Sequence, residues 1–170
     1  MSIIQEADLN KLSKEVRNNL KGYPNKSLLL TGGVGTGKTF TVIAILKHFN
    51  QDLNAHFYKF NDFLREFRAC ETCLEESSLM KEFVGKRHLV IDDFGTEKLT
   101  DYAYSIIIEF IDKRLLYNKS HLIITTNLSL KDIANVYDIR LSSRMIELFR
   151  IVKFEGKDLR LEKAKQNQKI

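Results

Sequence analysis

The sequence predicts an α/β domain built on a doubly wound, parallel, five-stranded sheet. Two observations lead to this prediction. Short apolar segments bounded by turn-forming or charged residues are typical of buried strands, and the chain has five, at residues 27–32, 56–60, 87–92, 120–127 and 149–154. Segments with apolar residues at helical spacing lie between them. Strands that are apolar on both faces and alternate with helices indicate helices on each side of the sheet, joined by right-handed crossovers.

The chain length fits one domain. With 170 residues, of which 44% are hydrophobic, the chain can bury one core and is short for two. We expect an amphipathic N-terminal helix and turn at residues 1–24, a core at 25–161 and a basic tail at 162–170. Because no apolar run reaches the length of a bilayer and the first residues lack a signal-peptide pattern, we expect no membrane partner and a cytoplasmic location.

The first helices can be placed from their spacing and their breaks. Residues 9–20 carry leucine and valine at helical spacing, and Gly22 and Pro24 then break the pattern. This predicts an amphipathic helix that ends in a turn before the first strand. Residues 39–49 have the same kind of apolar face and follow a glycine-rich turn.

The later helices are placed by capping residues. Asn61 is expected to cap the helix after the second strand, and Thr100 the helix after the third. Two short helices, at residues 129–136 and 139–148, follow the fourth strand and lead to the last one.

The two cysteines, Cys70 and Cys73, form a CxxC pair. A structural zinc site needs a second pair of ligands, and none accompanies this one. Their flanking residues resemble the surface of a helix, so we expect two free thiols.

The segment TGGVGTGKTF, residues 31–40, contains four of the eight glycines in the chain. It fits the pattern GxxxxGKT and lies between a predicted strand and a predicted helix, which is the context of a P-loop. Glycines allow backbone amides to surround phosphate oxygens at the positive end of the helix dipole. Lys38 can reach the β and γ phosphates, and Thr39 can bind Mg²⁺. The expected ATP-binding residues are Gly32, Gly33, Val34, Gly35, Thr36, Gly37, Lys38, Thr39 and Phe40.

Two adjacent aspartates end the third strand, in HLVIDDFG. Open α/β sheets bind ligands at the carboxyl ends of their strands, so both carboxylates are expected near the phosphates. Asp92 is the expected Mg²⁺ group, and Asp93 is placed to orient or deprotonate an attacking water. Glu97, on the following loop, is a second candidate for the base.

The fourth strand ends in Thr125, Thr126 and Asn127. Asn127 is expected to sense the γ phosphate or the water from the neighbouring strand, although asparagine is also an ordinary turn former. Further along, Arg140 and Arg144 are four residues apart and so share a helical face. Either can stabilise charge on a phosphoryl group, often from another subunit, or simply form a solvated basic face.

In this order, the P-loop, VIDDFG, IITTN and SRM resemble an AAA+ ATPase of the DnaC/IstB type, the group of helicase loaders and transposition helpers. The likeness covers residues 27–160. It implies ATP and Mg²⁺ as cofactors, catalysis at Lys38 and near Asp93, a sensor at Asn127 and an arginine finger at Arg144. Arg114 matches an arginine that is frequent in the group and is a candidate for a second trans-acting residue. Arg160 also matches, without an assignable role.

Two departures from the family pattern affect the expected partners. Helicase loaders usually carry a separate helicase-binding domain, whereas about 25 residues precede the first strand here. The N-terminal helix would then have to dock the partner, or the function differs. The sequence after Arg144 leaves no room for a C-terminal helical lid, so we expect no second sensor arginine.

The leading functional hypothesis is a DNA-associated ATPase and helicase loader that forms a homo-oligomer with a trans arginine finger. The net charge of +5 permits a polyanion partner. Nonspecific contact with DNA phosphates is expected from the helices between the second and third strands, where five basic residues are expected to cluster: Arg65, Arg68, Lys81, Lys86 and Arg87. Single-stranded DNA and a hexameric replicative helicase are the expected partners. The alternatives are a transposition helper that serves a transposase, a small-molecule P-loop kinase, and a module that binds nucleotide with little turnover.

Overall fold

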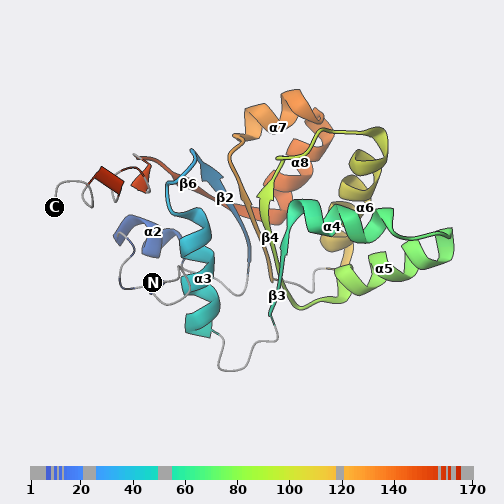
Figure 1. Ribbon diagram of the computed structural model, residues 1–170, viewed down its shortest axis with the longest axis horizontal. Helices are drawn as coiled ribbons and strands as arrows, with labels where there is room; N and C mark the ends of the chain where they lie inside the picture. Colours follow the sequence, from blue (N-terminus) through green and yellow to red (C-terminus); the bar gives the residue numbers. More distant parts are fainter. Residues whose placement is uncertain are drawn as a thin grey trace.

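The structure is a computed structural model that describes residues 7–8, 10, 12, 14–20, 26–49, 55–117, 121–156, 158–159, 161 and 164–165. In this part of the chain, five parallel strands form one sheet in the order β3-β4-β5-β2-β6 (Figure 1). The strands are β2 (Ser27–Gly32), β3 (Ala55–Lys59), β4 (His88–Phe94), β5 (His121–Thr126) and β6 (Phe149–Phe154). The predicted five-stranded parallel sheet is therefore confirmed.

Helices cover both faces of this sheet (Figure 1). They are α2 (Lys14–Asn19), α3 (Lys38–Phe49), α4 (Phe60–Arg68), α5 (Cys73–Gly85), α6 (Asp101–Tyr117), α7 (Leu130–Val136) and α8 (Ile139–Leu148). Alternate residues of a strand point to opposite faces. Leu28 and Leu30 of β2 accordingly pack with α3 and α2, whereas Leu29 packs in the layer formed by α4 to α8. The predicted doubly wound architecture is confirmed.

The strand order brings three loops together. All five strands run in the same direction, so they end at one edge of the sheet, which we call the carboxyl edge. β5 lies between β4 and β2, and Thr126 at its end is in register with Phe94 on one side and Thr31 on the other. The segments that leave β2, β4 and β5 therefore start side by side.

The capping predictions had different outcomes. Thr100 caps α6 as predicted, since its Oγ1 accepts a hydrogen bond from the Ala103 amide at 3.1 Å. The prediction for Asn61 is wrong, because α4 begins at Phe60 directly after β3 and Lys59 occupies the cap position without a side-chain hydrogen bond. Asn61 instead accepts a hydrogen bond from Thr96 in the loop after β4.

The N-terminal segment is described in part. Val16 of α2 and Leu20 pack against the cluster that contains Val42 and Ile45 of α3, so this helix has the apolar contact predicted for it. Leu9, Gly22 and Pro24 lie outside the described residues. The expected domain boundaries therefore stay predictions.

Two further expectations concern cysteines and membranes. Cys70 and Cys73 are both free thiols. Among the described residues, no helix combines the length and the apolar character needed to cross a bilayer.

Arg114 of α6 is buried, with an exposed fraction of 1%. Its Nη2 donates to the Phe83 carbonyl at 2.9 Å and its Nη1 to the Lys86 carbonyl at 3.0 Å, while the guanidinium lies over the Phe110 ring. Burial lowers the pKa of Arg114 to about 10. The side chain thus satisfies carbonyls at the C-terminus of α5, where the helix dipole favours a cation.

This position predicts a structural role for Arg114. Arg114→Ala leaves two carbonyls without their charged donor and creates a void, so we expect the free energy of unfolding to fall by about 2–4 kcal/mol. Urea unfolding measures this change. Lys113→Ala, which removes the neighbouring side chain and its ion pair with Glu109, is the control and is expected to change stability by less than about 1 kcal/mol. Equal stability of the two variants would contradict the capping role.

Candidate nucleotide-binding site

The glycine-rich loop connects β2 to α3, and at two of its glycines a side chain would collide with β6 or with the segment after it. Gly32 has a φ of +149°, and a Cβ there would lie 2.1 Å from the Phe154 carbonyl oxygen. Gly35 has a φ of +71°, and a Cβ there would lie 1.9 Å from Oδ1 of Asp158. The Leu159 amide also donates to the Gly35 carbonyl at 3.0 Å. The segment after β6 therefore packs directly on the loop, a contact that the sequence did not predict.

Lys38 begins α3 and lies under the loop, with an exposed fraction of 6%. Its Nζ donates to the carbonyls of Gly32 and Gly33, both at 2.7 Å, and to Oδ1 of Asn127 at 2.8 Å. The predicted lysine and the predicted sensor are thus in direct contact. These three acceptors are neutral. Phosphate oxygens are charged acceptors and would form stronger hydrogen bonds with the buried ammonium.

Asp92 lies at the end of β4 and is also buried, with an exposed fraction of 3%. Oδ1 of Asp92 accepts a hydrogen bond from Thr125 Oγ1 at 2.6 Å, and the Thr39 hydroxyl lies 3.2 and 3.3 Å from the two carboxylate oxygens. Burial raises the pKa of Asp92, and Asp93 adds to this, while the hydrogen bonds from Thr125 and Thr39 oppose it. A bound cation would favour the charged form of this carboxylate.

Oxygen donors at Thr39 and Asp92 fit Mg²⁺, which prefers one or two protein oxygens together with water and phosphate. Among the described residues there is no group of three or more His, Cys, Asp or Glu side chains that could hold a metal ion on its own. The donor set therefore fits a magnesium ion that is brought and shared by a nucleotide.

Asp93 adopts a left-handed conformation with a φ of +59°, which is unusual for a residue other than glycine. Its amide donates to Thr125 Oγ1 at 2.9 Å, and its carbonyl accepts a hydrogen bond from Thr96. The turn holds the half-buried Asp93 directly after Asp92 at the carboxyl edge. Glu97, the other candidate for the base, forms an ion pair with Arg68 of α4 at 2.9 Å.

Thr125 links these residues, although no role was predicted for it. Its hydroxyl donates to Asp92 and accepts from the Asp93 amide, so it fixes both aspartates relative to β5. The sequence carried part of the signal, because a threonine at the end of an apolar strand is expected to be buried and then needs a hydrogen-bond partner, but it did not identify that partner.

The five basic residues expected to cluster do not form one patch. Arg65 and Arg68 belong to α4 and pair with Asp62 and Glu97, the latter on the loop at the carboxyl edge. Lys86 and Arg87 directly precede β4, at the opposite edge, and Lys86 pairs with Glu82. The prediction of a single cluster is wrong, because α5, which carries Lys81, takes the chain from one edge to the other.

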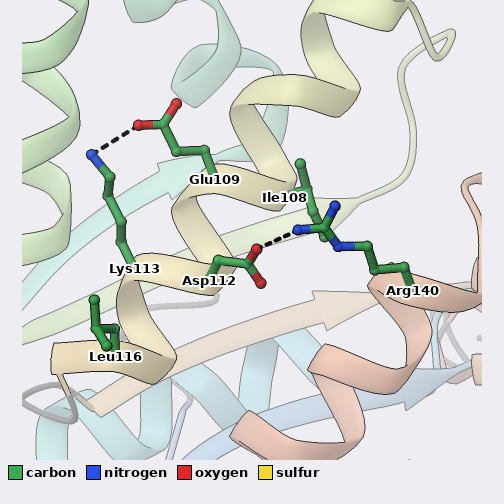
Figure 2. A pocket seen from close by; sticks show the side chains of 6 residues that line it. All are labelled: Ile108, Glu109, Asp112, Lys113, Leu116 and Arg140. Carbon is green, nitrogen blue, oxygen red and sulfur yellow. Dashed lines mark hydrogen bonds and ion pairs between the residues drawn. The ribbon is translucent and has the colours of Figure 1, made fainter.

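A cavity of about 340 Å³ lies away from the predicted nucleotide site (Figure 2). Side chains of α6 and the start of α8 line it: Ile108, Glu109, Asp112, Lys113, Leu116 and Arg140. It contains none of the P-loop residues. The predicted nucleotide site at the carboxyl edge and this cavity are therefore separate.

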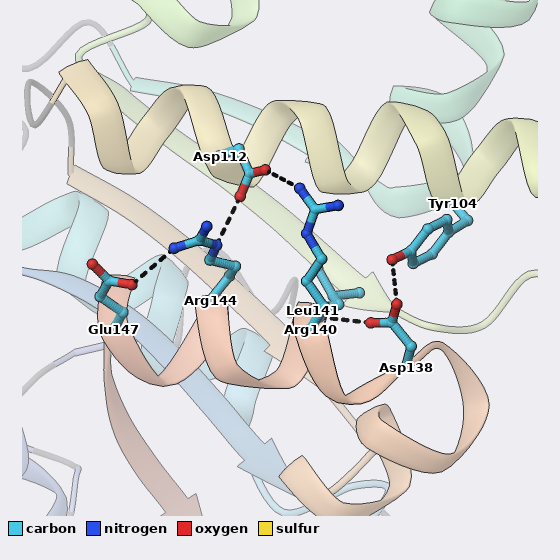
Figure 3. Close-up of polar contacts among 7 residues, drawn as sticks. All are labelled: Tyr104, Asp112, Asp138, Arg140, Leu141, Arg144 and Glu147. Carbon is cyan, nitrogen blue, oxygen red and sulfur yellow. Dashed lines mark hydrogen bonds and ion pairs between the residues drawn. The ribbon is translucent and has the colours of Figure 1, made fainter.

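Three of the predicted arginines, Arg114, Arg140 and Arg144, make their described contacts away from the P-loop of their own chain. Arg140 and Arg144 lie on α8 and form ion pairs with Asp112 of α6 (Figure 3). Arg114 is buried where it caps α5, so the structure gives it no surface to offer a neighbouring subunit, contrary to the expected trans-acting role. Arg160 lies outside the described residues.

Comparisons with known proteins agree with the observed fold. The profile of a family described as IstB-like ATP binding protein matches residues 10–167. No match was found among curated proteins. A crystal structure of the DnaC helicase loader is similar with a TM-score of 0.70 and 23% identity, over 91% of this chain and 100% of that chain. A crystal structure of DnaI is similar with a TM-score of 0.69 and 19% identity, over 91% of each chain.

A third similar structure is the replication initiator DnaA bound to AMPPCP and single-stranded DNA, with a TM-score of 0.68 and 18% identity, over 91% of this chain and 49% of that chain. At these identities the structural likeness shows the AAA+ P-loop fold, and the profile, which covers nearly the whole chain, shows the family. The chain therefore belongs to the IstB-like ATP-binding protein family.

Proposed function

We propose that this protein binds and hydrolyses ATP as a DNA-associated AAA+ ATPase, and that it acts as a loader of a replicative helicase. The observation that carries the proposal is the convergence of Lys38, Thr39, Asp92 and Asn127 through hydrogen bonds at one edge of the sheet. These are the side-chain types that phosphoryl transfer needs, and they come from three separate segments: α3, β4 and the loop after β5.

In the proposed mechanism, the protein binds the triphosphate before hydrolysis. The amides of residues 33–37 surround the phosphates, and Lys38 exchanges neutral acceptors for phosphate oxygens. Thr39 and Asp92 would hold the magnesium ion that accompanies ATP, and this ion would neutralise part of the phosphate charge.

Asp93 then acts on the attacking water. Its carboxylate makes no recorded hydrogen bond or ion pair within the described residues, and the turn that holds it is fixed by Thr125. Asn127 orients the same water or the γ phosphate from the adjacent strand. A glutamate would reach about one methylene farther, so hydrolysis by this chain is expected to be slow.

Arg144 completes the site of a neighbouring subunit in a homo-oligomer. It lies on α8, away from the P-loop of its own chain, and is partly exposed. An arginine supplied from another subunit stabilises the charge that develops during phosphoryl transfer. This assignment rests on the family resemblance and on the position of α8.

Two partner classes fit the same ATPase. The similar structures of DnaC and DnaI favour a helicase loader, while the family description favours a transposition helper of the IstB type. Affinity purification from cells separates them, because the first predicts a hexameric replicative helicase in the eluate and the second a transposase. A small-molecule kinase would form ADP only with an acceptor, whereas this proposal predicts phosphate release with water alone.

The first test concerns the catalytic base. Asp93→Ala is expected to lower kcat about 10²–10⁴-fold, because it removes a positioned acid–base group, and to leave ATP affinity nearly unchanged. Glu97→Gln is the matched control and is expected to retain activity, because Glu97 pairs with Arg68. Phosphate release and nucleotide binding are measured for both variants. Normal turnover by Asp93→Ala with inactive Glu97→Gln would assign the base to Glu97.

The second test concerns the subunit contact. Hydrolysis per subunit is expected to rise steeply with protein concentration, and Arg144→Ala is expected to lower the plateau by about 10³-fold or more. Sedimentation with and without ATP measures assembly under the same conditions. A rate per subunit that is independent of concentration, with a monomer throughout, would contradict the trans arginine.

The third test concerns DNA. Binding of single-stranded DNA is expected to weaken with salt, and Arg65→Gln with Arg68→Gln is expected to reduce the slope of log affinity against log salt by about 0.7 for each contact removed. Lys86→Gln with Arg87→Gln changes the same charge at the opposite edge and serves as the control. An affinity that does not respond to salt would exclude contact through phosphates.

A further inference from the structure

Helices α6 and α8 lie next to each other and are connected by polar side chains at two levels (Figure 3). At the first level, Asp138 caps α8 by accepting the Leu141 amide at 2.7 Å, and the Tyr104 hydroxyl of α6 donates to the other oxygen of Asp138. At the second level, Asp112 of α6 faces both arginines of α8. The N-terminal end of α8, which precedes both arginines in the sequence, is therefore hydrogen-bonded to α6.

Asp112 shares its two carboxylate oxygens between two cations. Oδ2 accepts a hydrogen bond from Nη2 of Arg140 at 2.8 Å, and Oδ1 lies 3.1 Å from Nε of Arg144. Oδ1 is shielded from water and has no aligned hydrogen bond, so the charge of Arg144 is what compensates it. Removal of this carboxylate charge would therefore release Arg144 from α6.

Arg144 is held from two sides. Besides the contact of its Nε with Asp112, its Nη1 lies 3.3 Å from Glu147 one turn later on α8. A guanidinium has five donors in a rigid planar fork. Within the described residues Nη2 has no recorded partner, so the group is oriented while some of its donors stay available. The side chain keeps an exposed fraction of 42%.

We propose that Asp112 is a positioning residue for Arg144, which it orients for a phosphate of a neighbouring copy of the chain. This inference rests on the proposed function, because it assumes that Arg144 acts in trans. A free arginine loses rotamer entropy when it docks, whereas an arginine that is already oriented loses less. Arg140 pairs with the second oxygen of Asp112 and therefore shares the charge of this carboxylate with Arg144.

The experiment mixes two inactive variants. The acceptor is Arg144→Ala, which has an intact site and no finger, and the donor is Lys38→Ala, which has a finger and no functional site. Their mixture is expected to recover hydrolysis. A second donor that carries Lys38→Ala and Asp112→Asn is expected to give a kcat about two- to fivefold lower at saturating donor, the range of a partly exposed ion pair. KM for ATP is expected to stay unchanged, because the acceptor site is intact.

Three controls separate positioning from loss of structure. Lys38→Ala with Glu109→Gln breaks the ion pair with Lys113 on the same face of α6 and is expected to recover hydrolysis fully. Lys38→Ala with Asp112→Glu keeps the charge and is expected to recover more than the asparagine donor. The donor with Lys38→Ala and Arg140→Gln keeps the contact between Asp112 and Arg144 without the second cation, and it is expected to recover at least as much hydrolysis as the Lys38→Ala donor. If the asparagine donor does not fold, this donor is used for the test.

The outcomes are distinguishable. No recovery with the plain Lys38→Ala donor would overturn the trans arginine, and the role of Asp112 would fall with it. Recovery with that donor, and equal or greater recovery with the Asp112→Asn donor, would overturn the positioning role alone. Loss of recovery with the Arg140→Gln donor would assign the acting group to Arg140 and would also overturn it.

Discussion

The site depends on one buried carboxylate that two hydroxyl groups hold in place. Asp92 ends β4, and its hydrogen bonds come from Thr125 of β5 and Thr39 of α3. A carboxylate with little exposure to water is costly unless it is compensated, and here burial raises its pKa. The hydroxyl groups reduce this cost without adding charge. The charge of Asp92 is therefore not neutralised by a cationic side chain in these hydrogen bonds. The same bonds connect β4, β5 and α3 to one another.

The second constraint is topological. In a parallel sheet the strand order decides which loops meet, and the order here places β5 between β4 and β2. Lys38 and Asn127 are far apart in the sequence yet hydrogen-bonded in the fold.

Much of this arrangement could be predicted from the sequence, because strands and phosphate loops have local signals. The apolar runs of β2 and β6 and the spacing of α8 gave the bounds that the structure has. The contacts of Thr125 could not be derived in the same way, since they depend on the register between β4 and β5 and on the irregularity between Ile91 and Phe94. Arg114 shows a different limit. Its position in a family pattern suggested a surface role, whereas its burial follows from the packing of α5 against α6.

The contact between the P-loop and the segment after β6 restricts how this protein can evolve. Position 35 excludes a side chain twice, once through its left-handed backbone and once through the carboxylate of Asp158. A smaller residue at position 158 would open the space and leave the backbone conformation unchanged. No single compensating substitution at position 158 can therefore admit alanine at position 35 without strain.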